Sequence, residues 1–272
     1  MSRIESGRFQ FHRLRHELGN YSLLRMRHCD GVIVSMHQSG THWLKFMLAS
    51  AMAEHFGLPG PQYNHANDII GGAKDTPTYP QLPELRSSHT IPPLLVANGL
   101  GAKLITLPPC VVLVRDIRAS LVSNYNKWRE RYAVPFSEYL RGDPSGHQFN
   151  SDIWWCIRFV NAWARMQSLN PARVKIVRYE ALVQDPFQSL QGIADHLGLS
   201  LSDASLEAGV RAATKNVMSK RSDPDRPPGE INQGEDHAFA AYDGADRLFF
   251  SASSRTYLHN SLGYDYALWA VP

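Results

Sequence analysis

The chain has 272 residues, of which 43% are hydrophobic and 19% charged, so it can bury a large core and is neither a long disordered chain nor a fibrous repeat. Its formal charge of +3, without a dense Lys/Arg run, gives little support to nucleic-acid binding, although a few arginines could hold a small anion. Three cysteines with no CxxC pair argue against a disulfide framework and against a zinc site.

The N-terminal segment is rich in Arg and His and lacks the apolar region of a secretory signal. We expect residues 1–30 to form a helical extension and residues 31–272 to form one domain. No stretch of the sequence is long and apolar enough to predict a membrane span. We therefore expect a cytoplasmic protein; the sequence leaves its oligomeric state open, a homodimer included.

Short, uncharged runs predict buried parallel strands, each followed by a helix. The strands are Gly31–Ser35, Val111–Val114 and Val174–Val177; their helices are Trp43–Phe56, the segment from an Asp116 cap to about Arg129, and the segment from Pro186 to Gly198. Another helix, from about Asp152 to Leu169, carries three tryptophans and is expected in the interior. The alternation predicts a single three-layer α/β domain with a central, mainly parallel sheet.

The first strand runs directly into Ser39-Gly40-Thr41 and then into a helix. Gly40 lets the backbone approach a ligand closely, while the two hydroxyls stand beside a helix N-terminus, which favours anions. The same residues could instead form an ordinary N-cap and a tight turn. No Lys follows Gly40, so the nucleotide-triphosphate loop GxxxxGK[ST] is absent and an ATPase or kinase is disfavoured.

Three further residues carry candidate chemistry. His89 precedes Ile91-Pro-Pro93 on a firm turn, and its pKa range suits removal of a proton from a hydroxyl. Arg115 ends the second strand, and Ser123 lies two helical turns further on, where both could hold a phosphate. Taken singly, they could equally be an ordinary histidine, a surface arginine and a solvated serine.

The order of the motifs resembles the family of sulfotransferases that use 3′-phosphoadenosine-5′-phosphosulfate (PAPS), from Gly31 to about Leu199. The matching pieces are S-G-T-x-W from Ser39, S-H-x-x-P-x-L-L from Ser88, V-R-D-x-R-x-S-L-V-S-N-Y from Val114 and Y-E-x-L-x-x-D-P from Tyr179. The resemblance implies a P-loop-like fold that transfers a sulfuryl group from PAPS to a hydroxyl of a small-molecule acceptor. The co-product would be 3′-phosphoadenosine-5′-phosphate (PAP), and no metal is expected.

The resemblance also implies roles for individual residues. Ser35 to Trp43, including Ser39, Gly40, Thr41 and His42, would bind the 5′-phosphosulfate, with Trp43 stacked on adenine. Arg115 and Ser123 would hold the 3′-phosphate, Tyr179 would contact the adenine edge, and His89 would be the general base. The basic loop near the family's C-terminus would lie between Lys220 and Gly229, where Arg221 and Arg226 compete for one role.

Gln38 departs from the family pattern, which usually has Lys or Arg immediately before Ser-Gly-Thr. That cation offsets the charge that builds on the bridging oxygen as the S–O bond breaks, whereas an amide adds no charge. His37, His42 and Lys45 are near in sequence and could replace it; His37 is the first candidate because it could be charged near neutral pH. Otherwise the enzyme is slow, or the site only binds.

Two other functions stay open: a small-molecule kinase, which would need a loop Lys and a magnesium carboxylate, and a catalytically silent PAP-binding protein. The acceptor itself is not predicted. Its pocket is expected between residues 60–83, 126–148 and 223–242. The aromatic side chains there, Tyr63, Tyr79, Trp128, Tyr132 and Tyr139, suit phenols, steroids, sugars or natural-product alcohols equally.

Overall fold

The computed structural model describes residues 7, 11, 26–76, 78–92, 106–225, 239–266 and 269. Most of the expected N-terminal extension lies outside these ranges, and so does Arg226. Within the described ranges, no helix has the length and apolar character needed to cross a membrane.

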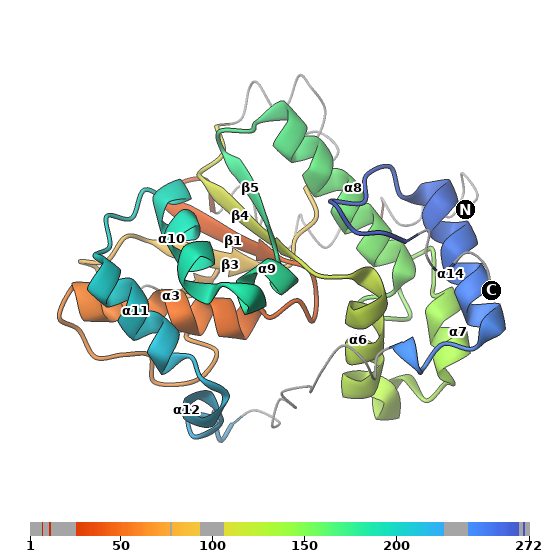
Figure 1. Cartoon of the computed structure of the whole chain (residues 1–272), viewed down its shortest axis with the longest axis horizontal. Helices are drawn as coiled ribbons and strands as arrows, with labels where there is room; N and C mark the ends of the chain where they lie inside the picture. Colours follow the sequence, from red (N-terminus) through yellow and green to blue (C-terminus); the bar gives the residue numbers. More distant parts are fainter. Residues whose placement is uncertain are drawn as a thin grey trace.

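A five-stranded sheet in the order β2-β3-β1-β4-β5 forms the centre of the molecule (Figure 1). The strands are β1 (Gly31–Ser35), β2 (Gly71–Gly72), β3 (Leu85–Ser88), β4 (Cys110–Val114) and β5 (Val174–Arg178). All neighbouring strands are parallel, with Val32 beside Cys110 and Cys110 beside Val174. The predicted α/β fold with a parallel sheet is therefore confirmed.

The helices follow the strands as the sequence predicts, with small shifts at their ends. They are α3 (Thr41–His55), α6 (Ile117–Tyr132), α7 (Phe136–Arg141), α8 (Ile153–Leu169), α9 (Tyr179–Gln184), α10 (Pro186–His196), α11 (Asp203–Ala212), α12 (Lys215–Ser219) and α14 (Gly244–Tyr257). Helix α3 starts earlier than predicted because Gly40 is its N-cap. Helix α6 continues past Arg129 and ends at Ala133 in a left-handed conformation.

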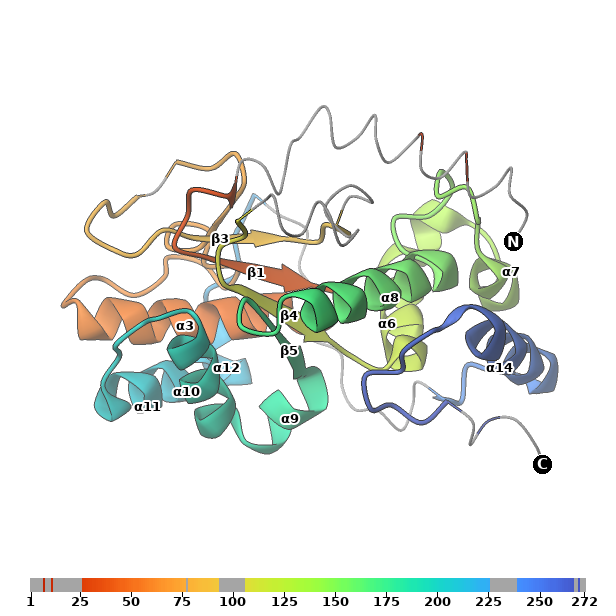
Figure 2. The same ribbon diagram turned by 90° about the horizontal axis from the view of Figure 1, so that it is seen from above.

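Two hydrophobic cores lie on the two faces of the sheet because successive strand side chains point to opposite faces. Val32 and Val34 of β1 face the core that contains α6 and α8. Ile33, between them, faces the core that contains α3 and α10. Figure 1 shows α3, α10 and α11 grouped beside the sheet, and α6, α7 and α14 gathered beyond the carboxyl ends of the strands; Figure 2 gives the same arrangement from above.

The loop at residues 36–40 lies where the direction of chain connection reverses. It follows β1, whose neighbours β3 and β4 lie on opposite sides of it. In open α/β sheets, a crevice forms at the carboxyl ends of strands at such a point, and ligands bind there. The fold therefore predicts a ligand site between the segments that follow β1, β3 and β4.

Candidate active site

The backbone turns sharply between β1 and α3. Gln38 and Gly40 both have positive φ, of 61° and 88°. The amide of Met36 donates to the carbonyl of Leu113 at 2.9 Å, which fastens the loop to β4. A Cβ on Gly40 would lie 2.7 Å from two ring carbons of Tyr179, so this position needs glycine both for its conformation and for space.

The loop hydroxyls shape the loop rather than reach out of it. Ser39 is fully buried, and its hydroxyl donates to the carbonyls of Met36 at 2.6 Å and Leu113 at 3.3 Å. Thr41 donates to Ser35 Oγ at 2.7 Å. The expectation that both hydroxyls face a ligand is not supported, because their hydrogens are used inside the protein. Backbone N–H groups are the donors that the loop leaves for an anion.

Helix α3 differs from its neighbours at its N-terminus. Its N-cap, Gly40, makes no side-chain capping bond, and its first turn has no acidic residue. The other long helices described, α6, α8, α10, α11 and α14, each begin with an Asp or Ser whose side chain accepts a backbone N–H. The first N–H groups of α3 thus lack an internal acceptor, and the positive end of its dipole points into the crevice, which suits an anion.

His89 follows β3 and lies next to the end of β1. Its Nδ1 is 2.8 Å from the carbonyl oxygen of Ser35 and 3.2 Å from Ser35 Oγ. A carbonyl only accepts, so Nδ1 carries the proton and Nε2 keeps its lone pair. The side chain is exposed. Nε2 of His89 is therefore able to accept a proton; the sequence predicts a base at this residue, and that role stays a prediction.

His37 stacks on His89, with ring centroids 4.2 Å apart, and its other side meets Trp155 of α8 at 4.6 Å. Burial lowers the pKa of His37 well below 6.5, and the charges of His89 and Lys127 lower it further. The imidazole is therefore neutral near neutral pH. The hypothesis that His37 replaces the missing loop cation is not supported for the protein in this state.

His42 is exposed in the first turn of α3, yet it is also neutral. Desolvation by the surrounding protein, followed by the charges of Lys45 and Lys127, lowers its pKa to about 4. Lys45 itself is only 3% exposed, and its ammonium donates to Asn67 Oδ1 at 2.7 Å. Of the three candidates near the loop, Lys45 is the one that brings a cation.

The structure shows a second cation near the loop, Lys127 on α6, which the sequence analysis did not predict. Its side chain is exposed and lies 5.4 Å from the ring centroid of Trp128. Its charge lowers the pKa of His37, His42 and His89, so all three rings lie within its field. The available signal was the helical spacing, because Lys127 lies one turn beyond Ser123 on the same face of α6.

Three of the expected nucleotide-binding residues, Arg115, Tyr179 and Trp43, form one contiguous group. Arg115 donates through Nη1 to the carbonyl of Gln38 at 3.2 Å, and its guanidinium carbon lies 4.7 Å from the ring centroid of Tyr179. Trp43 meets Tyr179 edge to face, with centroids 6.1 Å apart, and donates its indole N–H to the carbonyl of Ala213 at 2.9 Å. Two aromatic rings and one guanidinium thus adjoin the anion loop.

Of the two arginines expected near the C-terminal part of the site, Arg226 lies outside the described ranges, and the role of Arg221 stays a prediction. Arg221 donates to the carbonyl of Pro61, and its guanidinium carbon is 5.9 Å from the ring centroid of Phe46. No described contact joins Arg221 to Arg115. Ser123 is buried on α6, where the sequence placed it.

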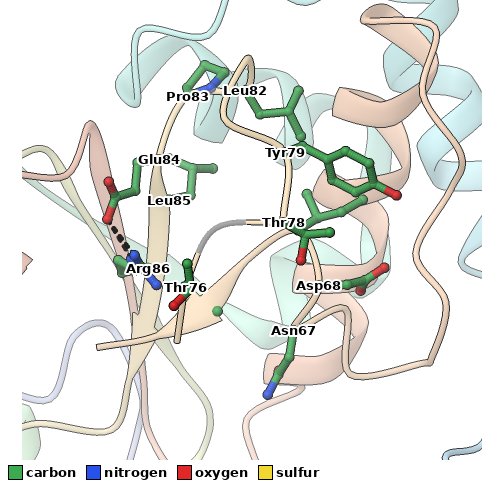
Figure 3. Close-up of a pocket in the computed structure, with 12 residues that line it drawn as sticks. Asn67, Asp68, Thr76, Thr78, Tyr79, Leu82, Pro83, Glu84, Leu85 and Arg86 are labelled. Carbon is green, nitrogen blue, oxygen red and sulfur yellow. Dashed lines mark hydrogen bonds and ion pairs between the residues drawn. The ribbon is translucent and has the colours of Figure 1, made fainter. Parts of the chain in front are cut away.

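The surroundings of two aromatic side chains expected in the acceptor pocket are different from one another. Tyr139 is fully buried, and its hydroxyl donates to Ser151, so it belongs to the core; its expected place in the pocket wall is corrected. Tyr79 lines a hollow beside β3, and Figure 3 shows Asn67 at the end of that hollow with its side chain pointing away from Tyr79.

Among the described residues, no group of three or more His, Cys, Asp or Glu could hold a metal ion.

The chain belongs to the sulfotransferase family. The family model described as sulfotransferase domain matches residues 29–229, with the loop, His89, Arg115 and Tyr179 inside the match. No curated protein matches the sequence significantly.

Three solved structures in complex with PAP share the fold. A mouse sulfotransferase, SULT7A1, complexed with PAP is 18% identical, with a TM-score of 0.57 over 89% of this chain and 88% of that one. Retinol dehydratase in a complex with retinol and PAP is 14% identical, with a TM-score of 0.57 over 92% of this chain and 88% of the other. The same enzyme with androsterone and the inactive cofactor PAP gives a TM-score of 0.58 at 14% identity, over 92% of this chain and 88% of that one.

Proposed function

We propose that the protein transfers a sulfuryl group from PAPS to a hydroxyl of a small-molecule acceptor. One chain of hydrogen bonds carries the proposal. His89 Nδ1 bonds to Ser35, and Ser35 Oγ accepts from Thr41, the first residue of the uncapped helix α3. A base with a free lone pair is thereby held beside an anion-binding helix N-terminus, the pairing that transfer of an anionic group to a hydroxyl requires.

In the proposed reaction, the acceptor oxygen attacks sulfur in line with the bridging oxygen of PAPS. A new S–O bond forms, while the bond from sulfur to the bridging oxygen breaks and its electron pair stays on the 5′-phosphate. The proton of the acceptor hydroxyl passes to Nε2 of His89. The protein contributes mainly by holding the groups in position and by offsetting the charge on the leaving oxygen.

The donor would lie across the group formed by the loop, Trp43, Tyr179 and Arg115. Backbone N–H groups of residues 38–42 would hold the 5′-phosphosulfate, and Trp43 and Tyr179 would contact adenine. Arg115 and Ser123 would hold the 3′-phosphate; the buried Nε of Arg115 has no hydrogen-bond partner among the described residues, which costs free energy unless a ligand oxygen pairs with it. PAP in three related structures supports this nucleotide class.

Selectivity for PAP over AMP tests the donor assignment. Calorimetry should give much tighter binding of PAP, because AMP lacks the 3′-phosphate. Charge-assisted bonds contribute about 1.5–3 kcal/mol each. Arg115→Ala should therefore weaken PAP binding by about tenfold to over a hundredfold, with AMP affinity unchanged. Arg129→Ala, which removes an exposed arginine of α6, is the matched control. Equal affinities of the wild type for PAP and AMP would overturn the assignment.

The neutral side chain of Gln38 leaves a catalytically silent binding protein as the alternative function. A measurement of turnover distinguishes the enzyme from that alternative. A screen of phenols, steroids, sugars and other alcohols with labelled PAPS should reveal an acceptor. His89→Ala should then lower kcat by about 10²–10⁴ without weakening PAP binding. PAP binding with no labelled product from any acceptor class would favour the silent protein, and strict magnesium dependence would favour a kinase. Cytoplasmic location and homodimer formation stay predictions.

A further inference from the structure

The loop beside the proposed phosphosulfate site contains no cationic side chain. Gln38 is an amide, and His37 and His42 both have strongly lowered pKa values, so they are neutral near neutral pH. Transfer of the sulfuryl group nevertheless leaves a second negative charge on the 5′-phosphate. A positive charge near the leaving oxygen would lower the barrier to that step. The fold must supply this charge from outside the loop if the protein turns over.

Lys45 has the geometry to supply it. It lies one helical turn after Thr41 on the same face of α3, the face whose Thr41 hydroxyl bonds to Ser35. Side chains in a helix lean toward its N-terminus, so the aliphatic stem of Lys45 runs back toward the loop. The side chain is 3% exposed, and its bond of 2.7 Å to Asn67 Oδ1 fixes the position of the ammonium.

The electrostatic surroundings agree with this direction. The charge of Lys45 lowers the pKa of His42 and of His89, so the ammonium acts on one ring that follows the loop in α3 and on one ring that contacts Ser35 just before it. A buried cation near the positive end of a helix is unfavourable by desolvation and by interaction with the dipole. A bound anion at that helix end offsets both costs, which gives the buried lysine a role that simple packing would not.

We propose that Lys45 replaces the loop cation that Gln38 lacks, and that it stabilises the negative charge on the 5′-phosphate oxygen as the sulfuryl group leaves. This inference rests on the proposed function, because it assigns the ammonium to the leaving group of PAPS. Gln38 then contributes its backbone, which Arg115 holds through the carbonyl.

Lys127 is the competing cation. Its charge also lowers the pKa of His42 and His89, but it acts in addition on His37, which packs against Trp155, and its exposed ammonium lies against Trp128. An exposed ammonium stabilises a developing charge less than a buried one. Lys127→Met therefore serves as the comparison variant, and Lys175→Met, on β5, serves as the control for loss of one positive charge.

The experiment compares PAP with adenosine 3′-phosphate, which lacks the 5′-phosphate. The 5′-phosphate of PAP already carries the negative charge that develops on the leaving group when the sulfuryl group is transferred from PAPS. Lys45→Met should weaken PAP binding by about tenfold or more, the loss expected for one charge-assisted hydrogen bond, with unchanged binding of adenosine 3′-phosphate. With an acceptor from the screen, the single-turnover rate should fall by about 10²–10³. Lys45→Arg should retain most of both properties.

Moving the charge gives a second, independent measurement. The double variant Gln38→Lys with Lys45→Met should recover PAP binding and turnover, because the ammonium returns to the loop. Gln38→Lys alone should bind PAP no better than the wild type. Urea unfolding should show no loss of stability in Lys45→Met, because a buried charge is removed.

Separate results would overturn the two proposals. A wild-type protein that binds PAP no better than adenosine 3′-phosphate contradicts the proposed function as well as the inference. A wild type that prefers PAP, with Lys45→Met keeping the same preference and rate, contradicts the inference alone. Loss of the preference in Lys127→Met instead of Lys45→Met also contradicts it and assigns the cation to α6.

Discussion

At the scale of single residues, the role of His89 depends on which ring nitrogen carries its proton. The Ser35 carbonyl keeps the proton on Nδ1, and desolvation by the surrounding protein lowers the pKa of the ring below 6.5 although the side chain is exposed at one edge of the crevice. The bond to Ser35 opposes this shift, while Lys45 from α3 and Lys127 from α6 add to it. The ring of His37, which stacks on the ring of His89, is neutral and adds no charge. The proposed base is thus neutral, and able to accept a proton, over the physiological range.

The pH dependence of kcat/KM follows from this protonation state. Only neutral His89 accepts a proton, so activity should be constant above pH 6.5 and should fall at lower pH, through an inflection below 6.5. The measurement needs an aliphatic alcohol as acceptor, because its hydroxyl does not titrate in that range. Lys127→Met should shift the inflection to higher pH by removing a nearby positive charge. An inflection above 6.5 in the wild type would contradict this assignment of the base.

At the scale of elements, the start of α3 distinguishes the anion site from an ordinary helix cap. Asp116 caps α6 by accepting the amide of Arg118 at 2.7 Å, as the sequence predicted. Gly40 begins α3 without such a bond and lies against Tyr179. The N-terminus of α6 is thus capped by a side chain, whereas the N-terminus of α3 has no side-chain cap and lies against an aromatic ring.

Gly40→Ala tests this enclosure, with Gly57→Ala as its matched control. Both glycines have positive φ, of 88° and 64°, but a Cβ would meet Tyr179 at 2.7 Å in the first and nothing within 4 Å in the second. Gly57→Ala should cost about 1–2 kcal/mol of unfolding free energy from backbone strain alone. Gly40→Ala should cost more and should also weaken PAP binding, as urea unfolding and calorimetry can measure. Equal stability losses with unchanged PAP binding would count against the contact.

At the scale of the whole molecule, the C-terminal segment fastens onto the ends of the central strands. Tyr264 donates to Glu180 Oε2 at 2.6 Å, and Glu180 Oε1 accepts the amide of Asp116 at 3.1 Å. One carboxylate thereby joins the start of α9, the start of α6 and residue 264. Asp116 and Glu180 directly follow Arg115 and Tyr179 in the chain. The junction with Tyr264 therefore helps to hold these two residues of the proposed nucleotide site in position.

Tyr264→Phe should weaken that junction. The variant leaves one oxygen of the Glu180 carboxylate without its partner, which should cost about 1–3 kcal/mol of unfolding free energy. PAP affinity should fall slightly through the displaced starts of α6 and α9. Tyr63→Phe is the control, because no hydrogen bond of the Tyr63 hydroxyl occurs among the described residues. A stability loss of the same size in both variants would show that the bond to Glu180 contributes nothing specific.

The sequence by itself determined the fold class and the positions of the main elements. Gly31–Ser35 is a buried strand and Asp116 a helix cap because short-range propensities and hydrogen bonds decide both. The family followed from motifs in a fixed order, and the orientation proposed for His89 agrees with the turn after β3. These features depend on residues close together in the chain, so local patterns are enough to predict them.

Only the tertiary structure decided how the candidate site is charged and which side chains face it. Burial makes His37 neutral, the turn of α3 directs Lys45 toward Asn67, and the fold carries Arg221 to Pro61 and Tyr139 into the core. Each outcome depends on neighbours from distant segments and on the water that packing removes. The spacing of residues along the chain predicts neither the distant neighbours nor the loss of water. Desolvation and side-chain direction are determined only when the strands and helices pack together.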